Sequence, residues 1–141
     1  MYKNKRLKKP NSNSDIFGRV PEYNKNGIFV PPGDIHLTYG NRGMGALHIS
    51  QRHHNDMEKS GFSGVDDVPA YVAAIIKPGT PVHCEGDMTT KGERVSTVNV
   101  TIGKAILEFH YDDEHPDGGF YKVITAYGAR KKHGPKVGTV L

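Results

Sequence analysis

The chain has 141 residues, a formal net charge of +4 and one cysteine, Cys84. This length predicts a single domain with one modest core, and a lone cysteine excludes an internal disulfide. No apolar run is long enough to span a membrane, and the N-terminus lacks the hydrophobic segment of a signal peptide, so we expect no membrane partner. The basic balance, with a pI of about 9.1, favours a polyanion such as nucleic acid as the partner.

The first 25 residues have the composition of a flexible tail or linker. A basic run at positions 3–9 is followed by Pro10 and a polar stretch of asparagines and serines. Such a segment buries too little apolar surface to order itself. We therefore expect a basic tail over residues 1–25 and a folded domain over residues 26–141.

Two helices are expected in the first half of this domain. A short strand region over residues 28–39 is interrupted by two prolines, and a glycine-containing loop then leads into a helix from Gly45 to about Lys59. Asp66 or Asp67 can cap a second helix, which ends before a proline-glycine pair.

The second half of the chain is strand-like. Alternating apolar and polar residues predict strands at 82–85, 94–100, 104–111 and 120–127. In the last of these, Tyr121, Val123, Thr125 and Tyr127 share one face. The predicted fold is therefore α+β, with N-terminal helices packed on one face of an antiparallel β-meander.

The stretch from Gly43 to His54 holds the densest group of side chains that can transfer protons near neutral pH. On a helix, His48 and Arg52 are four residues apart and share a face, whereas His53 falls on a mostly apolar stripe. A histidine beside an arginine places a proton carrier next to a permanent cation, which suits an anionic transition state. His48, Arg52 and His53 are therefore candidate catalytic residues.

Two other functions stay open at this point. One is a metal-dependent nuclease with histidine ligands, although the residue one turn after His48 is Arg52 rather than a second histidine. Its ligands would come from His36, His48, His53, His54, His83 and His110, with Asp34, Asp56 or Glu58. The other is a basic RNA-binding module without catalysis, for which the aromatic content of 9% offers few stacking side chains.

Thr125 and Tyr127 lie two apart on a predicted strand, so both hydroxyls leave the same face. Opposite a helix that carries His48, such hydroxyls could hold a phosphate. RNA supplies its own nucleophile, the ribose 2′-OH, so a histidine base and cationic or hydroxyl groups can cleave it without a metal or cofactor. His36, Lys122 and Arg130 are the expected substrate-binding residues.

Two segments, Gly33-Asp34-Ile35-His36-Leu37 and Gly45-Ala46-Leu47-His48-Ile49-Ser50-Gln51-Arg52-His53, carry a family resemblance. They resemble the phage- and toxin-associated branch of the barnase, EndoU, colicin and RelE-like (BECR) nuclease superfamily. Domains of that branch carry a strand, then a helix with this histidine pattern, and end in a β-meander whose late strand bears hydroxyl residues.

The resemblance implies a metal-independent ribonuclease that acts as a bacterial toxin, with transfer RNA as the expected substrate. It also implies export as part of a larger toxin, as in contact-dependent growth inhibition, and action in the cytoplasm of the target cell. By position, His48, Arg52 and His53 carry over as catalytic, with Thr125 and Tyr127 as hydroxyls of the late strand. The expected protein partner is an acidic immunity protein that covers the cationic face.

Overall fold

The computed structural model describes residues 4–84, 98–126 and 134–141. Its elements in chain order are β1 (Gly18–Val20), β2 (Tyr23–Lys25), β3 (Ile28–Val30), β4 (Gly33–His36), α1 (Gly45–Arg52), α2 (His54–Lys59), the 3₁₀ turn η2 (Val65–Asp67), α3 (Val68–Ile75), β5 (Pro81–His83), β6 (Val98–Ile102), β7 (Ala105–Tyr111), β8 (Gly119–Ala126) and β9 (Lys136–Thr139).

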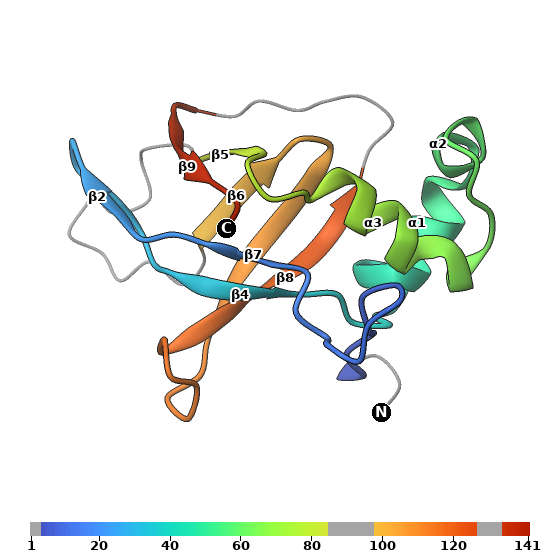
Figure 1. The fold of residues 1–141 in the computed structure, drawn as a ribbon, viewed down its shortest axis with the longest axis horizontal. Coiled ribbons are helices and arrows are strands. Elements are labelled where there is room, and N and C mark those ends of the chain that lie inside the picture. Colours follow the sequence, from blue (N-terminus) through green and yellow to red (C-terminus); the bar gives the residue numbers. More distant parts are fainter. Residues whose placement is uncertain (1–3, 85–97, 127–133) are drawn as a thin grey trace.

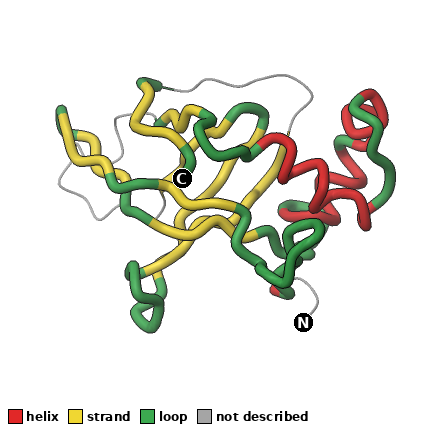
Figure 2. The backbone as a smooth tube through the Cα atoms, in the orientation of Figure 1, coloured by secondary structure: helices red, strands yellow, loops and turns green. Residues whose placement is uncertain are grey.

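Seven strands form one mixed sheet in the order β1-β4-β8-β7-β6-β5-β9, and β2 pairs with β3 in a separate hairpin. Strand β4 runs parallel to β8, and the other neighbours are antiparallel. The two edges of the sheet meet, because the backbone N–H of Leu141 donates to the carbonyl of Arg19 in β1 at 2.9 Å. The sheet therefore curls into a nearly closed barrel, with the helices gathered beyond one end (Figures 1 and 2).

The predicted fold class is wrong, because the helices do not cover one face of an antiparallel meander. Among the described residues the longest helices have eight residues, which span only about 12 Å, too short to cover a sheet face. The predicted meander does exist in β6, β7 and β8, but four short strands extend it and one of them pairs in parallel. Of these four strands, β4 and β5 overlap the predicted strand regions 28–39 and 82–85, whereas β1 and β9 are too short to show a clear alternation in the sequence.

The core lies inside the curled sheet. Along β7 the residues alternate between buried and more exposed, and Leu107 and Phe109 are buried in the core. Tyr121 in β8 is fully buried beside them, and its hydroxyl donates to the carbonyl of Pro31 at 2.6 Å. Burial raises the pKa of this phenol well above its usual value, so it stays a neutral donor.

The segment expected to be a flexible tail, residues 1–25, is structured over much of its described part. Strand β1 pairs with β4, and residues 23–25 form one arm of the hairpin. Farther toward the N-terminus, Arg6 forms an isolated antiparallel bridge with Thr38, just beyond the end of β4. Composition alone misses this order, because the segment is held by an edge that another part of the chain provides.

Helix α1 is fixed to the end of β4 through its backbone. The carbonyls of Thr38 and Tyr39 accept from the N–H groups of Ala46 and Leu47, at 3.0 and 2.8 Å. These bonds satisfy two donors that a helix N-terminus leaves unpaired. Gly45 adopts a φ of +83° at this junction, a conformation that suits glycine.

The predicted helix from Gly45 to Lys59 is broken in two. His53, with φ −125° and ψ 26°, separates α1 from α2, although its carbonyl still accepts from the N–H of Met57. The second predicted helix is confirmed as α3, with a proline in its first turn. No helix in the part of the chain described is long and apolar enough to cross a membrane.

Candidate catalytic face of the sheet

The imidazole of His48 bridges α1 and the sheet. Its Nδ1 lies 2.7 Å from the carbonyl oxygen of Arg42, and its Nε2 lies 3.0 Å from the Thr125 hydroxyl in β8. His48 and Thr125 are 77 positions apart in the chain. Two of the predicted catalytic residues are thus brought into direct contact.

The partners of His48 determine where its proton lies. A carbonyl can only accept, so Nδ1 carries the hydrogen and donates it to Arg42. In the neutral ring, Nε2 then has a lone pair and accepts the hydrogen bond from Thr125. His48 therefore presents a basic nitrogen toward the sheet, with its orientation fixed from behind.

The predicted face of Thr125 is wrong, and a β-bulge is the reason. Leu107 pairs with Val123, but its neighbour Ile106 pairs with Thr125, so Ile124 is an extra residue in β8. Directly opposed residues in an antiparallel pair share a face. Thr125 therefore lies on the outer face with Ile106, not on the inner face with Val123.

This outer face of β4, β8 and β7 carries a connected set of polar and aromatic side chains, which we call the polar face. One row across the strands is formed by His36, Lys122 and Glu108, which are register partners. The polar face consists of Asp34, His36, Glu108, His110, Phe120, Lys122 and Thr125. His48 approaches its Thr125 end.

His53 packs beside His48. The two rings meet edge to face with centroids 5.5 Å apart, and Nδ1 of His53 lies 3.5 Å from the Asp56 carboxylate. Burial lowers the pKa of His53, although Asp56 acts in the opposite direction. His53 is therefore a mainly neutral neighbour of His48 near pH 7. Arg52 is exposed on α1, one turn after His48.

His36, predicted to bind substrate, is only 2% exposed. Its Nδ1 donates to the carbonyl of Asp15 at 2.8 Å, and burial lowers its pKa. The neighbouring Lys122 is half-buried on β8. His36 is therefore a covered member of the polar face that donates to the N-terminal segment, whereas Lys122 is placed to meet a ligand.

Three residues near Phe120 come close enough to hold a metal ion. The ligand atoms of Asp34, His36 and His115 lie within 4.8 Å of one another, the one such group among the residues described. Asp34, however, already receives the Arg19 guanidinium at 3.1 Å. Nδ1 of His115 accepts from the backbone N–H of Asp117, which leaves the proton of the neutral ring on Nε2. A metal would have to displace both Arg19 and this proton.

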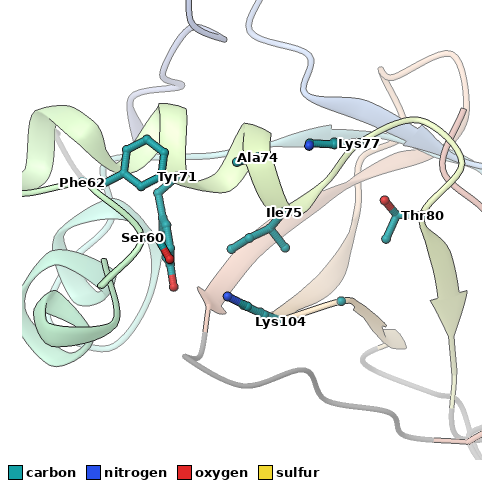
Figure 3. Close-up of a pocket in the computed structure, with 9 residues that line it drawn as sticks. Ser60, Phe62, Tyr71, Ala74, Ile75, Lys77, Thr80 and Lys104 are labelled. Carbon is teal, nitrogen blue, oxygen red and sulfur yellow. The ribbon is translucent and has the colours of Figure 1, made fainter. Parts of the chain in front are cut away.

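A pocket of about 310 Å³ lies elsewhere, between α3 and the turn from β6 to β7 (Figure 3). Phe62, Tyr71 and Ile75 form its apolar part, and Lys77 and Lys104 are its charged groups. Lysine and tyrosine ordinarily titrate at about pH 10, and burial raises the pKa of Tyr71 further. The polar face, rather than this pocket, therefore holds the groups suited to proton transfer at neutral pH.

Tyr127 and Arg130, predicted as catalytic and substrate-binding residues, lie outside the described residues. Glu108 was not among the predicted site residues, and His110 was predicted only as a possible metal ligand, although their alternation with Leu107 places both on the polar side of β7. Arg6 was not among the predicted site residues either, because it lies in the expected tail.

Comparisons with protein-family models, with curated proteins and with solved structures each find no match to this chain. A function for this chain therefore has to be inferred from the geometry of the polar face and from the residues of the chain itself.

Proposed function

We propose that this domain is a metal-independent RNA endonuclease in which His48 transfers the proton. The observation that carries the proposal is the pair of hydrogen bonds at His48, which direct a basic Nε2 toward Thr125 at 3.0 Å. A base held in this way is pre-oriented, so little reorganisation is needed when a substrate hydroxyl takes the place of Thr125.

The reaction follows from RNA's own chemistry. Nε2 of His48 accepts the proton of the ribose 2′-OH, and the 2′ oxygen attacks the adjacent phosphorus. The bond from phosphorus to the 5′ oxygen breaks, which leaves a 2′,3′-cyclic phosphate on one product. The 5′ oxygen takes up a proton from water, because the lowered pKa of His53 keeps that ring mainly unprotonated, and the hydroxide that remains takes the proton from His48. Lys122 and the Thr125 hydroxyl stabilise the charge on the phosphate oxygens.

The decisive experiment measures cleavage of total RNA in EDTA by the wild type and two matched variants. His48→Ala should lose activity by roughly a hundredfold or more, as expected for a proton-transfer group. His54→Ala is the control, because His54 is exposed on the adjoining helix and its Nδ1 bonds locally, to the carbonyl of Gln51. It should cleave as the wild type does.

Three outcomes would overturn this proposal. Full activity in a folded His48→Ala variant would remove the assigned base. Cleavage that requires added metal would favour the cluster of Asp34, His36 and His115 instead. Binding without any cleavage would favour a non-catalytic RNA-binding module.

We further propose, from the sequence resemblance to the BECR superfamily, that the domain acts as an exported toxin on transfer RNA in a target cell. Arg42 and Arg52 are exposed close to His48 in the chain, so an acidic immunity protein could cover the site by charge complementarity. Wild-type protein made in a bacterial cytoplasm should arrest growth, and His48→Ala should not. Harmless production of catalytically active wild type would contradict the toxin role, but not the nuclease activity.

A further inference from the structure

Phe120 lies at the end of the polar face opposite Thr125 and is surrounded by planar side chains. His110, its register partner on β7, is nearly parallel to it, with an interplanar angle of 17° and centroids 5.9 Å apart. His36 meets the ring edge to face at 5.4 Å. The guanidinium carbon of Arg6 lies over the ring, 4.7 Å from its centroid.

The backbone holds Arg6 in place. Leu7 donates its N–H to the carbonyl of Leu37, and Tyr39 donates to the carbonyl of Lys5, both at 2.8 Å. Residues 5–7 therefore run antiparallel to the segment that follows β4. Because Arg6 is exposed and Phe120 is half-buried beneath it, the guanidinium is the solvent-facing layer of a stack.

A guanidinium supported on an aromatic ring is a surface on which a nucleobase can stack. The carboxylates near Phe120 are paired with a cation. Asp34 precedes the register pair of Ile35 and Tyr121, and Arg19 bonds both Asp34, at 3.1 Å, and Asp117, at 2.7 Å. Because Arg19 neutralises these two carboxylates, the feature that a ligand meets at this end of the polar face is the guanidinium on the ring.

The spacing relates this stack to His48. Ile106, opposite Thr125, and His110, opposite Phe120, are four residues apart on β7, or about 13 Å by strand geometry. Lys122 lies between them on the same face. An extended dinucleotide spans such a distance, with its phosphate beside Lys122.

We propose that Arg6 and Phe120 form a base-stacking subsite for single-stranded RNA. The subsite binds the base of a nucleotide near the one whose 2′-OH faces His48. This inference rests on the proposed ribonuclease function, because it takes the substrate strand to run along the polar face from His48 toward Phe120.

The test measures binding of a short single-stranded oligonucleotide with 2′-O-methyl riboses, which cannot be cleaved because the nucleophile is blocked. Arg6→Lys keeps the positive charge but loses the planar guanidinium. Phe120→Leu keeps an apolar side chain but loses the aromatic ring. Each should weaken binding roughly tenfold, as for the loss of one base-stacking contact. Lys5→Ala is the control, because it removes an exposed neighbouring charge but no plane.

A second probe, the same backbone without bases, separates stacking from phosphate contact. The wild type and Arg6→Lys should bind it equally. Wild-type affinity in Arg6→Lys, or an equal loss on both probes, would overturn the subsite while leaving cleavage by His48 intact. If the wild type neither binds nor cleaves RNA, the proposed function itself is wrong.

Discussion

At the scale of single residues, the imidazole of His48 has two partners of unlike character. The Arg42 carbonyl can only accept, whereas the Thr125 hydroxyl can either donate or accept. The first contact therefore fixes the ring, and the second can change direction when His48 gains a proton. A histidine with one rigid and one reversible partner suits repeated proton transfer.

The hydrogen bond between Thr125 and His48 leads to a prediction for the Thr125 hydroxyl. Thr125→Val keeps the shape of the side chain but removes the hydroxyl, so Nε2 of His48 loses its partner and the phosphate loses a donor. We expect cleavage to fall by roughly tenfold or more, since one oriented hydrogen bond is lost, while Thr125→Ser retains most activity. The measurement is the rate of oligonucleotide cleavage at pH 7 by the wild type and both variants. Equal rates in the valine and serine variants would assign Thr125 a packing role only.

At the scale of elements, the junction between β4 and α1 sets the position of His48. A Cβ on Gly45 would come within 2.8 Å of the Thr38 carbonyl and 2.9 Å of Gly40 Cα, at a φ of +83°. Gly61 has a similar φ of +89° but open space around it. The two glycines thus share the backbone conformation and differ in crowding.

We expect Gly45→Ala to destabilise the fold by roughly 1–3 kcal/mol more than Gly61→Ala, because only the former adds an overpacked contact. Urea denaturation of both variants measures the difference. Gly45→Ala should also lose cleavage activity where it is still folded, since α1 must shift and carry His48 with it. Equal stabilities would indicate that the junction yields without strain.

Sequence patterns predicted the helix that carries His48 but missed several features around it, for identifiable reasons. The helix that starts at Gly45 and the alternation along β7 are local, so they could be read from neighbouring residues. The bulge at Ile124 has no local signal, and it moved Thr125 to the opposite face from the one predicted. Arg6 was assigned to a tail, because its pairing with Thr38 depends on an edge 32 positions later in the chain. Strands β1 and β9 are too short for alternation to reveal them, so the nearly closed sheet was not predicted.

At the scale of the whole molecule, one buried and two half-buried histidines link stability to pH. Burial lowers the pKa values of His36, His53 and His110, so the folded state keeps these rings neutral below their usual pKa of 6.5. The unfolded chain binds protons first as the pH falls below 6.5, so the stability that the neutral rings support is present above 6.5 and is lost below it. Arg19 lowers the pKa of Asp117 from 3.8, so the stability that this ion pair contributes is present above pH 3.8 and is lost only in more acidic solution.

We therefore expect the Tm to fall by several degrees between pH 7.5 and pH 5.0. His36→Gln should lower the Tm at pH 7.5 but flatten its dependence on pH, because a titrating group is gone. His54→Ala, at an exposed position, should leave the slope unchanged. Thermal scans across this range provide the measurement, and a Tm that rises toward pH 5.0 would contradict the linkage.

The antiparallel course of residues 5–7 along the end of β4 has a mechanical consequence. Force applied at the N-terminal side would load first the hydrogen bond from Tyr39 N–H to the Lys5 carbonyl. It would then load the bond from Leu7 N–H to the Leu37 carbonyl. The neighbouring β4 and β8 would stay joined meanwhile, because they pair elsewhere along β4. Force–extension traces should therefore begin with a short, weak step before the main rupture. That first step would lift Arg6 from Phe120 and remove the proposed base-stacking subsite while the sheet is still folded.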